Sequence, residues 1–274
     1  DVYGRTLLHR AVDSTHSKHK DIWEWLLAHG CDVNAKDEDG ETAIFEAQMR
    51  AIAVAGWNVA PLSAYSNWRL KGGSLPTRTL VITFDDAYQD FAESAFPVLD
   101  RYNFPATVFV PTGLVGGLAT WDGSPKGSKS IMSWDTIRAL AAKGIAFAPH
   151  SRTHAHLTKL EGSELRAEIA GSGQDLQRVL GTPALHFAPP YGETGPEADA
   201  VIEANYEISV GVNLGIANRK SPVHALPRLE MLYYRDPERW TSFLSGTGAA
   251  YLAARQCARA FRRLLLPGPG SAYN

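Results

Sequence analysis

Two neighbouring carboxylates end an apolar run in the stretch TLVITFDDAYQDF at residues 79–91. Leu80 to Phe84 indicate a buried strand, and Asp85 and Asp86 follow it directly. Adjacent carboxylates repel each other, and burial penalises the charge on each. One Asp could cap the helix expected over 90–102, but a cap leaves the second Asp unexplained. The pair therefore indicates more than a helix cap.

Two histidines, His150 and His154 in PHSRTHAHLT, follow a second expected strand, Ile145–Ala148. They are four residues apart, so on one helical turn they would face the same way. With one carboxylate they would form a metal site that keeps positions open for water and substrate. Surface or capping histidines can have the same spacing. A metal site becomes the better interpretation if the fold brings the two histidines close to the Asp pair.

Short β-rich runs alternate with helical runs over most of the chain, which is typical of parallel β/α architecture. In such folds the chemistry lies on loops at the carboxyl ends of the strands. A third strand end is followed by the Pro-Pro-Tyr-Gly turn at 189–192, and another expected strand carries Arg228. The expected strands are 58–61, 79–84, 106–110, 145–148, 184–188, 206–210 and 225–229, and the expected helices are 41–55, 90–102, 133–143, 161–180 and 196–204.

The first 47 residues repeat themselves, because DVYGRTLLHRA at 1–11 aligns with DEDGETAIFEA at 37–47. The stretch GRTLLHRA resembles the ankyrin family, although only one repeat and the start of another are present. Stacked repeats need about three members to bury a continuous core. We therefore expect a partial, helical ankyrin-repeat segment over 1–44 and a second domain over 45–274.

The motifs TFDDAYQD, HSRTHAHLT and FAPPYGE are similar, in order and spacing, to the first three motifs of the NodB-type polysaccharide deacetylases, carbohydrate esterase family 4. The resemblance covers about residues 45–240, with a core of about 75–240. It implies an α/β fold, a distorted (β/α) barrel. It also implies one divalent metal ion, most often zinc, and hydrolysis of an acetyl group, usually from N-acetylated sugars.

Carried over to this sequence, the resemblance implies that Asp86, His150 and His154 are the metal ligands. It makes Asp85 the base that takes a proton from the attacking water. The backbone N–H of Tyr191 would help to stabilise the oxyanion. The metal would polarise the acetyl carbonyl and lower the pKa of water.

The sequence departs from the family pattern in two places near these residues. The usual Gly after the Asp pair is Ala87, and the usual R-x-P-Y is replaced by residues 188–191, APPY. The second change resembles a subgroup of envelope and exopolysaccharide deacetylases, in which an arginine of a later LPR sequence orients the base. Arg228 in HALPRLEM matches that arginine, and an ordinary pairing with a surface carboxylate is the alternative.

The general acid and the sugar contacts are less clearly marked. The family's late catalytic histidine has no clean match; His224, just before LPR, is the candidate, and an ordinary loop histidine is the alternative. Trp121, in a Gly-rich loop, is the candidate for stacking on a sugar ring, with Pro190 and Tyr191 beside it. His156 has no family counterpart and is interpreted as structural or exposed.

The composition limits the kinds of partner that we expect. The net charge is −2 over 274 residues, without a long basic run, so nucleic acid is not an expected partner. No apolar stretch reaches 18 residues, so no membrane span is expected. The two cysteines, Cys31 and Cys257, do not suggest a disulfide framework. The expected partners are an acetylated polysaccharide or oligosaccharide and, through the ankyrin segment, a protein.

Two other functions stay open. Some relatives hydrolyse other C–N bonds in small molecules on the same fold, and an inert domain could serve a non-catalytic, ankyrin-based interaction protein. The presence of both Asp and both His residues argues against the inert domain. By resemblance the deacetylase would belong to the cell envelope or be secreted, whereas a native ankyrin fusion would favour the cytoplasm.

Overall fold

The computed structural model describes residues 43–121 and 129–265, and the expected ankyrin segment at 1–44 lies outside them apart from residues 43–44. The chain divides into two compact units. The described parts of unit 1 are 43–58, 90–104 and 231–249, and those of unit 2 are 59–89, 105–230 and 250–265. All the candidate site residues belong to unit 2. None of the described helices is long and apolar enough to cross a membrane.

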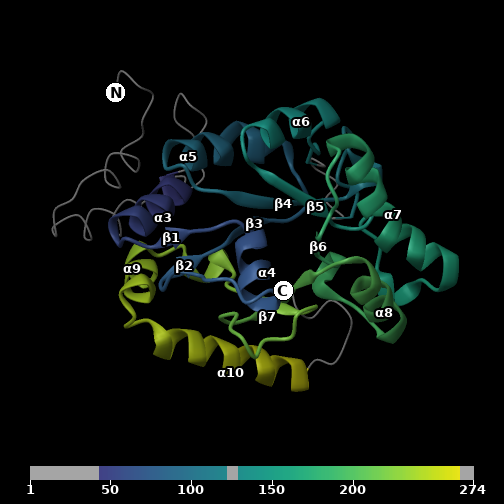
Figure 1. The fold of residues 1–274 in the computed structure, drawn as a ribbon. Helices are drawn as coiled ribbons and strands as arrows, with labels where there is room; N and C mark the ends of the chain where they lie inside the picture. Colours follow the sequence, from purple (N-terminus) through teal and green to yellow (C-terminus); the bar gives the residue numbers. More distant parts are fainter. Residues whose placement is uncertain (1–42, 122–128, 266–274) are drawn as a thin grey trace. The chain divides into compact units, whose positions relative to one another are not determined.

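Unit 2 is built on parallel strands that follow one another in chain order (Figure 1). The first sheet has the order β3 (Ile82–Phe84), β4 (Ala106–Val110), β5 (Ala146–Pro149), and the second has β6 (His186–Phe187), β7 (Ile208–Leu214), β8 (Leu226–Arg228). Two further short strands, β1 (Asn58–Val59) and β2 (Thr79–Leu80), pair separately. The parallel β/α prediction is therefore confirmed.

The expected barrel is not seen as a closed ladder of strands. Between the two sheets the backbone N–H of Ala188, just after β6, donates to the carbonyl of Pro149 at the end of β5 (3.2 Å). Among the described residues no strand pairing joins β8 to β3. Strands of two and three residues have too few backbone groups to sustain a continuous ladder, so the sheet is interrupted at these points.

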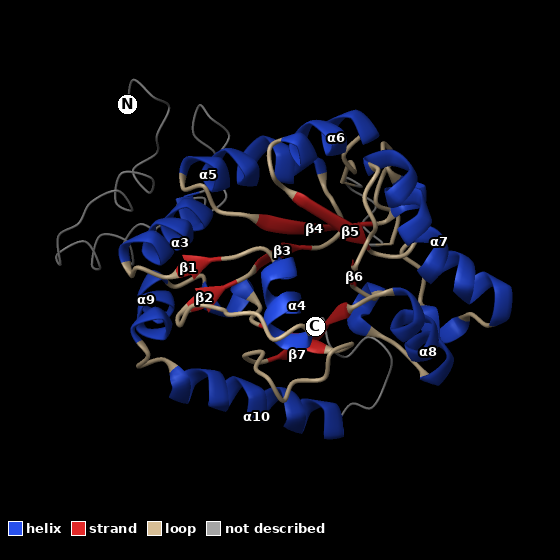
Figure 2. Cartoon of the chain, viewed as in Figure 1, coloured by secondary structure: helices blue, strands red, loops and turns tan. Residues whose placement is uncertain are grey.

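Helices of unit 2 follow the strands (Figure 2). They are α4 (Leu62–Leu70), α6 (Trp134–Ala142), α7 (Gly162–Leu180), α8 (Pro196–Asn205) and α10 (Ala249–Leu265), with short 3₁₀ turns η2 (Thr112–Leu114), η3 (Leu157–Lys159) and η4 (Pro190–Gly192). Their ends follow from local chemistry. The hydroxyl of Ser133 caps α6 by accepting from the N–H of Thr136, and Gly181 ends α7 in the left-handed region (φ 73°).

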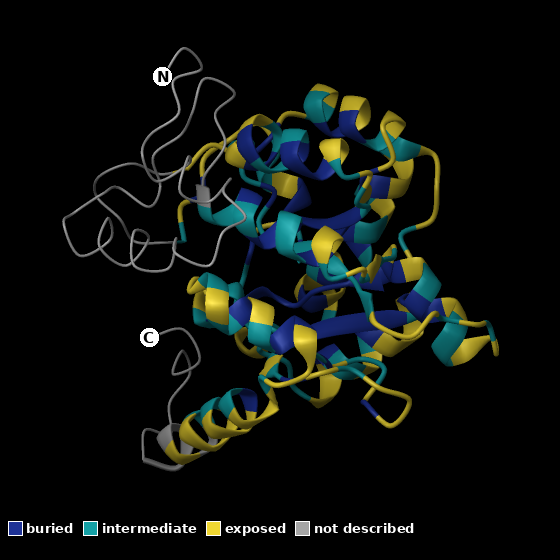
Figure 3. Cartoon of the chain, turned by 90° about the vertical axis from the view of Figure 1, so that its left-hand side faces the viewer, coloured by how far each residue is buried: buried dark blue, intermediate teal, exposed yellow. Residues whose placement is uncertain are grey.

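The core of unit 2 consists of two clusters, because successive side chains at the end of β6 point to opposite faces of the sheet. Phe187 faces α7 and α8, where it packs with Ile169 and Ile202, while Ala188 packs in the cluster on the other face. That second cluster also contains Leu62 and Tyr65 of α4. It further contains Phe109, Ala148, Ile208, Val210 and Leu226. Figure 3 shows that most exposed residues lie on the helices and loops, while β4 and the first half of β7 are fully buried.

Unit 1 contains α3 (Ala43–Val54), a π-helical turn (Phe91–Ala95) continued by α5 (Phe96–Arg101), the 3₁₀ turn η5 (Met231–Tyr234) and α9 (Pro237–Ser245). Its centre is aromatic, because Trp240 stacks on Phe243 with ring centroids 5.5 Å apart. The indole N–H of Trp240 also donates to the carbonyl of Gln48 (3.1 Å). These contacts tie α9 to α3 across 192 residues of sequence.

Candidate active site

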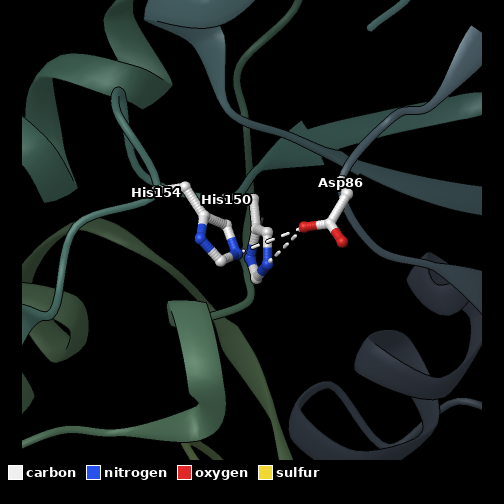
Figure 4. Close-up of side chains that lie close together, drawn as sticks. All are labelled: Asp86, His150 and His154. Atoms are coloured by element: carbon white, nitrogen blue, oxygen red, sulfur yellow. Dashed lines mark ion pairs between the residues drawn. The ribbon is translucent and has the colours of Figure 1, made fainter. Parts of the chain in front are cut away.

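Three side chains from two strand ends point at one another in unit 2 (Figure 4). Asp86 follows β3, His150 follows β5, and His154 lies four residues further along the same loop. The Asp86 Oδ1 lies 3.2 Å from the Nε2 of His154 and 3.5 Å from the Nε2 of His150. Both imidazoles are buried. The structure therefore brings Asp86 together with the two histidines.

The two histidines do not share a helical turn, as their spacing suggested. Residues 150–156 form a loop, in which Ser151 (φ 60°) and His154 (φ 57°) adopt the left-handed conformation. That conformation turns the chain back, so the loop brings the two rings to 5.0 Å between centroids. The two rings are therefore close together, as expected, but a loop with left-handed residues brings them together and not a helical turn.

The turn after β3 is also left-handed, at Asp86 (φ 71°) and Ala87 (φ 53°). It is fixed by Met132, whose N–H donates to the carbonyl of Ala87 (2.9 Å). The strand ends at Phe84, so Asp85 and Asp86 lie in the turn. The turn, and not the alternation of side chains along a strand, therefore sets the directions of the two carboxylates. The positive φ also explains why a Gly suits the position of Ala87 in related sequences.

The donor atoms are suited to a divalent cation. The Nδ1–H of His150 donates to the carbonyl of Ala188 (2.6 Å), which leaves the lone pair of Nε2 facing Asp86. Two imidazole nitrogens and one carboxylate oxygen match zinc sites that keep open positions. Ligand bonds of about 2.1 Å in a tetrahedral site would separate the ligand atoms by about 3.4 Å, close to the two distances found. The cluster therefore has the composition and the size to hold such an ion.

The two carboxylates have different electrostatic environments. Burial raises the pKa of Asp86, but the neighbouring imidazoles of His150 and His154 outweigh burial and hold that pKa well below the usual value. Burial also raises the pKa of Asp85, but the charge and hydrogen bonds of Arg228 outweigh it, so the pKa of Asp85 is lowered too. Both groups are therefore ionised, each by its own partner.

Arg228 reaches Asp85 from the end of β8. Its Nη1 and Nη2 donate to Oδ1 and Oδ2 of Asp85, both at 2.7 Å, and its Nε donates to the carbonyl of Gly211 (2.9 Å). A further bond runs from Nη1 to the hydroxyl of Thr83 on β3 (3.3 Å). The surface-pairing alternative for Arg228 is excluded by this geometry, because its partner is the candidate base.

Tyr191 lies beside the cluster in the turn η4, with a left-handed backbone (φ 59°). Its ring meets that of His154 edge-on at 4.7 Å, and the ring of His156 stacks on it at 4.1 Å. The Nδ1 of His156 is in turn 2.9 Å from the Oε2 of Glu193. The sequence led us to interpret His156 as structural or exposed and did not single out Glu193; their positions within the HAHLT and PYGE motifs were the available signal.

The ring of Trp121 stacks on that of His154, at 4.1 Å between centroids and with an interplanar angle of 19°. Tyr88 lies beyond it at 6.3 Å. Trp121 is thus at the cluster, as the sugar-contact prediction requires, and Pro190 is buried in the turn that carries Tyr191.

His224 lies in the turn that precedes β8, whereas Arg228 ends that strand. The role of His224 as the general acid stays a prediction.

Comparison with known proteins gives two family matches. The polysaccharide deacetylase model matches residues 72–208, which is half of the chain, and the ankyrin-repeat model matches residues 3–38, outside the described residues. The Bacillus subtilis (strain 168) protein YxkH, which is named for the same deacetylase family, is 24% identical over 188 residues, covering 68% of this chain and 63% of YxkH. A poly-beta-1,6-N-acetyl-D-glucosamine N-deacetylase of Staphylococcus aureus (strain N315) is 35% identical over 72 residues, 26% of this chain and 24% of that protein. The chain thus spans less than two thirds of either relative.

Solved structures share the fold. The Streptococcus pyogenes deacetylase PplD, solved in complex with acetate, superposes with a TM-score of 0.63 at 23% identity, covering 71% of this chain and 83% of PplD. IcaB from Ammonifex degensii superposes with a TM-score of 0.62 at 22% identity, covering 75% of this chain and 88% of IcaB. With the matched segment containing the Asp pair, both histidines and Tyr191, the chain belongs to the polysaccharide deacetylase family.

Proposed function

We propose that the chain is a metal-dependent hydrolase that removes acetyl groups from an acetylated polysaccharide, most simply one that contains N-acetylglucosamine. The observation that carries this proposal is the cluster of Asp86, His150 and His154 beside the Asp85–Arg228 pair. The name of the Staphylococcus aureus relative supports the choice of sugar.

Each residue has a separate task in this proposal. Asp86, His150 and His154 hold one divalent ion, with zinc as the first choice. When bound, the ion polarises the acetyl carbonyl and lowers the pKa of water.

The remaining tasks belong to the residues around the cluster. Asp85 takes the proton of the attacking water, and Arg228 keeps Asp85 ionised and oriented. The backbone N–H of Tyr191 donates to the oxyanion. Trp121 and Tyr191 form the apolar wall against which the sugar ring packs, and Pro190, which is buried, supports the turn that carries Tyr191.

The test is acetate release from N-acetylglucosamine oligomers by the full chain, first stripped with a chelator and then supplied with zinc or cobalt. Activity is expected only with metal. Asp85→Asn should lose activity and keep the metal, while Asp86→Ala should lose both. Asp135→Asn is the control, because its side chain is 89% exposed on α6. Unchanged activity in Asp86→Ala would contradict the ligand assignment.

The same site could serve hydrolysis of another C–N bond in a small molecule. A panel of acetylated glycans and small acetamides, assayed with the zinc-loaded chain, separates the two. Turnover of small amides with none on oligomers would favour the second function. A chain that binds metal and hydrolyses neither would favour a non-catalytic, ankyrin-based interaction protein.

A further inference from the structure

One carboxylate on α7 holds the loop that carries both histidines of the cluster. The Oε2 of Glu168 accepts the backbone N–H of Arg152 (2.8 Å) and of Thr153 (2.9 Å), while its Oε1 accepts the hydroxyl of Thr153 (2.8 Å). These two residues lie between His150 and His154. Glu168 therefore binds the middle of the segment whose ends supply the two imidazoles.

This segment needs an outside support. Ser151 and His154 both have positive φ, a conformation that residues other than Gly adopt only when their surroundings fix it. The loop makes few backbone bonds within itself, and its N–H groups at 152 and 153 point to Glu168. A charged acceptor makes stronger bonds to N–H groups than a neutral one, so this carboxylate is suited to the task.

The opposite edge of the loop is held by η2. The N–H groups of Thr112 and Gly113 donate to the carbonyls of Ser151 (3.1 Å) and Arg152 (2.8 Å). The side chain of Arg152 binds Asp175, one of the residues of α7, through Nε (2.8 Å) and Nη2 (3.1 Å). The carbonyls of Ser151 and Arg152 are thus bound by η2, while the N–H groups of Arg152 and Thr153 are bound by Glu168 on α7.

We propose that Glu168 is a positioning residue for the metal centre, fixing the loop so that the Nε2 atoms of His150 and His154 converge on Asp86. The proposal rests on the proposed function, because it concerns the same metal. Glu168 acts indirectly, because both of its carboxylate oxygens accept hydrogen bonds from the loop. It should therefore govern the affinity for the ion and leave the identity of the ligands unchanged.

The test measures the zinc dissociation constant of the full chain by competition with a chromophoric chelator, together with the melting temperature of the metal-free chain. Glu168→Ala should weaken zinc binding by about 10–100-fold, the usual effect of removing an outer support of a metal site. Glu168→Gln keeps a carbonyl oxygen for the two N–H groups and should retain most of the affinity. Glu164→Ala, an exposed position one turn earlier on α7, is the matched control and should change nothing.

Two outcomes overturn the positioning role. One is a Glu168→Ala variant that binds zinc as tightly as the wild type, even if its melting temperature falls, since a purely structural residue would behave in that way. If Glu168→Ala does not fold, Glu168→Asp replaces it: the shorter side chain cannot reach both N–H groups and should bind zinc more weakly than Glu168→Gln. Equal zinc affinities of Glu168→Asp and Glu168→Gln would be the second outcome that contradicts the positioning role. A wild-type chain that binds no zinc would overturn the proposed function as well, which distinguishes the two failures.

Discussion

Arg228 and Asp85 are joined by two hydrogen bonds of 2.7 Å, although 143 residues separate them in sequence. The planar guanidinium meets the carboxylate fork to fork, which fixes the plane of the carboxylate as well as its charge. The remaining nitrogen of Arg228 is bound to the carbonyl of Gly211. Asp85 is thus held by a side chain that is itself held by the backbone of β7.

Replacing Arg228 should lower turnover without removing the metal. In Arg228→Lys the ammonium can restore the charge but not the two-bond geometry, so kcat should fall by about 10-fold or more; in Arg228→Ala it should fall by about 10²–10³-fold. The measurements are kcat for acetate release and zinc content per chain. Arg138→Ala, whose partner Asp135 is exposed, serves as the control. Full kcat in Arg228→Ala would show that Asp85 needs no such partner.

The candidate site residues at the strand ends could be predicted from the sequence, because each group lies within a few residues of its strand. A carboxylate pair, two histidines and a Pro-Pro-Tyr-Gly turn each follow an apolar run, and parallel strands bring their carboxyl ends together. The partner of Arg228 could be predicted only through the resemblance to known deacetylases. Nothing in the local sequence near residue 228 identifies Asp85.

Other features depend on contacts that the sequence pattern does not encode. Residues 151–153 are bound to α7 and η2, and His154 adopts a left-handed conformation. The spacing of the histidines suggested a helical turn, which does not form. Glu168 is one of several acidic residues on α7, and only the path of the loop distinguishes it. The helix α4 was not predicted, because it is only nine residues long and its apolar residues are interrupted by Ser66 and Asn67.

Removing the indole of Trp121 should affect the metal as well as the sugar. Its ring covers that of His154, whose side chain is only 5% exposed, so Trp121→Ala should admit water to a ligand. We expect KM for N-acetylglucosamine oligomers to rise and zinc affinity to fall by about 10-fold, as for other changes around metal ligands. Trp121→Phe should keep most of both. A rise in KM with an unchanged zinc dissociation constant would restrict Trp121 to the sugar contact.

Gly192 should not tolerate a side chain. Its φ is +65°, and a Cβ there would overlap the side chain of Val212. Gly192→Ala should therefore cost about 2 kcal/mol or more in the free energy of unfolding, from backbone strain and overlap together. Urea denaturation measures this cost, and Val212→Ala in the same chain should recover the part due to overlap. Gly195→Ala, which meets open space, should change stability by about 0.5 kcal/mol or less.

Stability should fall in mild acid through His186, which is buried at the start of β6. Burial lowers the pKa of His186 to about 4, with smaller and opposing effects of Glu207 and Lys71. In the unfolded chain the pKa is about 6.5, so the unfolded state binds the proton first and stability is lost as pH falls from about 6.5 toward 4.

The loss due to His186 should reach about 2 kcal/mol between pH 7 and pH 5. Urea denaturation at these two pH values compares the wild type with His186→Gln, which does not titrate. The variant should lose less stability than the wild type by about that amount. Parallel losses in the two chains would mean that His186 is not the source of the pH dependence.

The pairing of Asp85 with Arg228 also sets an order of events during synthesis. A ribosome makes Asp85 143 residues before Arg228, and it makes Asp86, both histidines of the cluster and Tyr191 between the two. A nascent chain that ends before β8 would contain Asp86, His150 and His154 but would leave the base without its orienting partner. Ion capture and catalytic competence would therefore be acquired at different times, and hydrolysis would begin only after the last strand of the second sheet has been added.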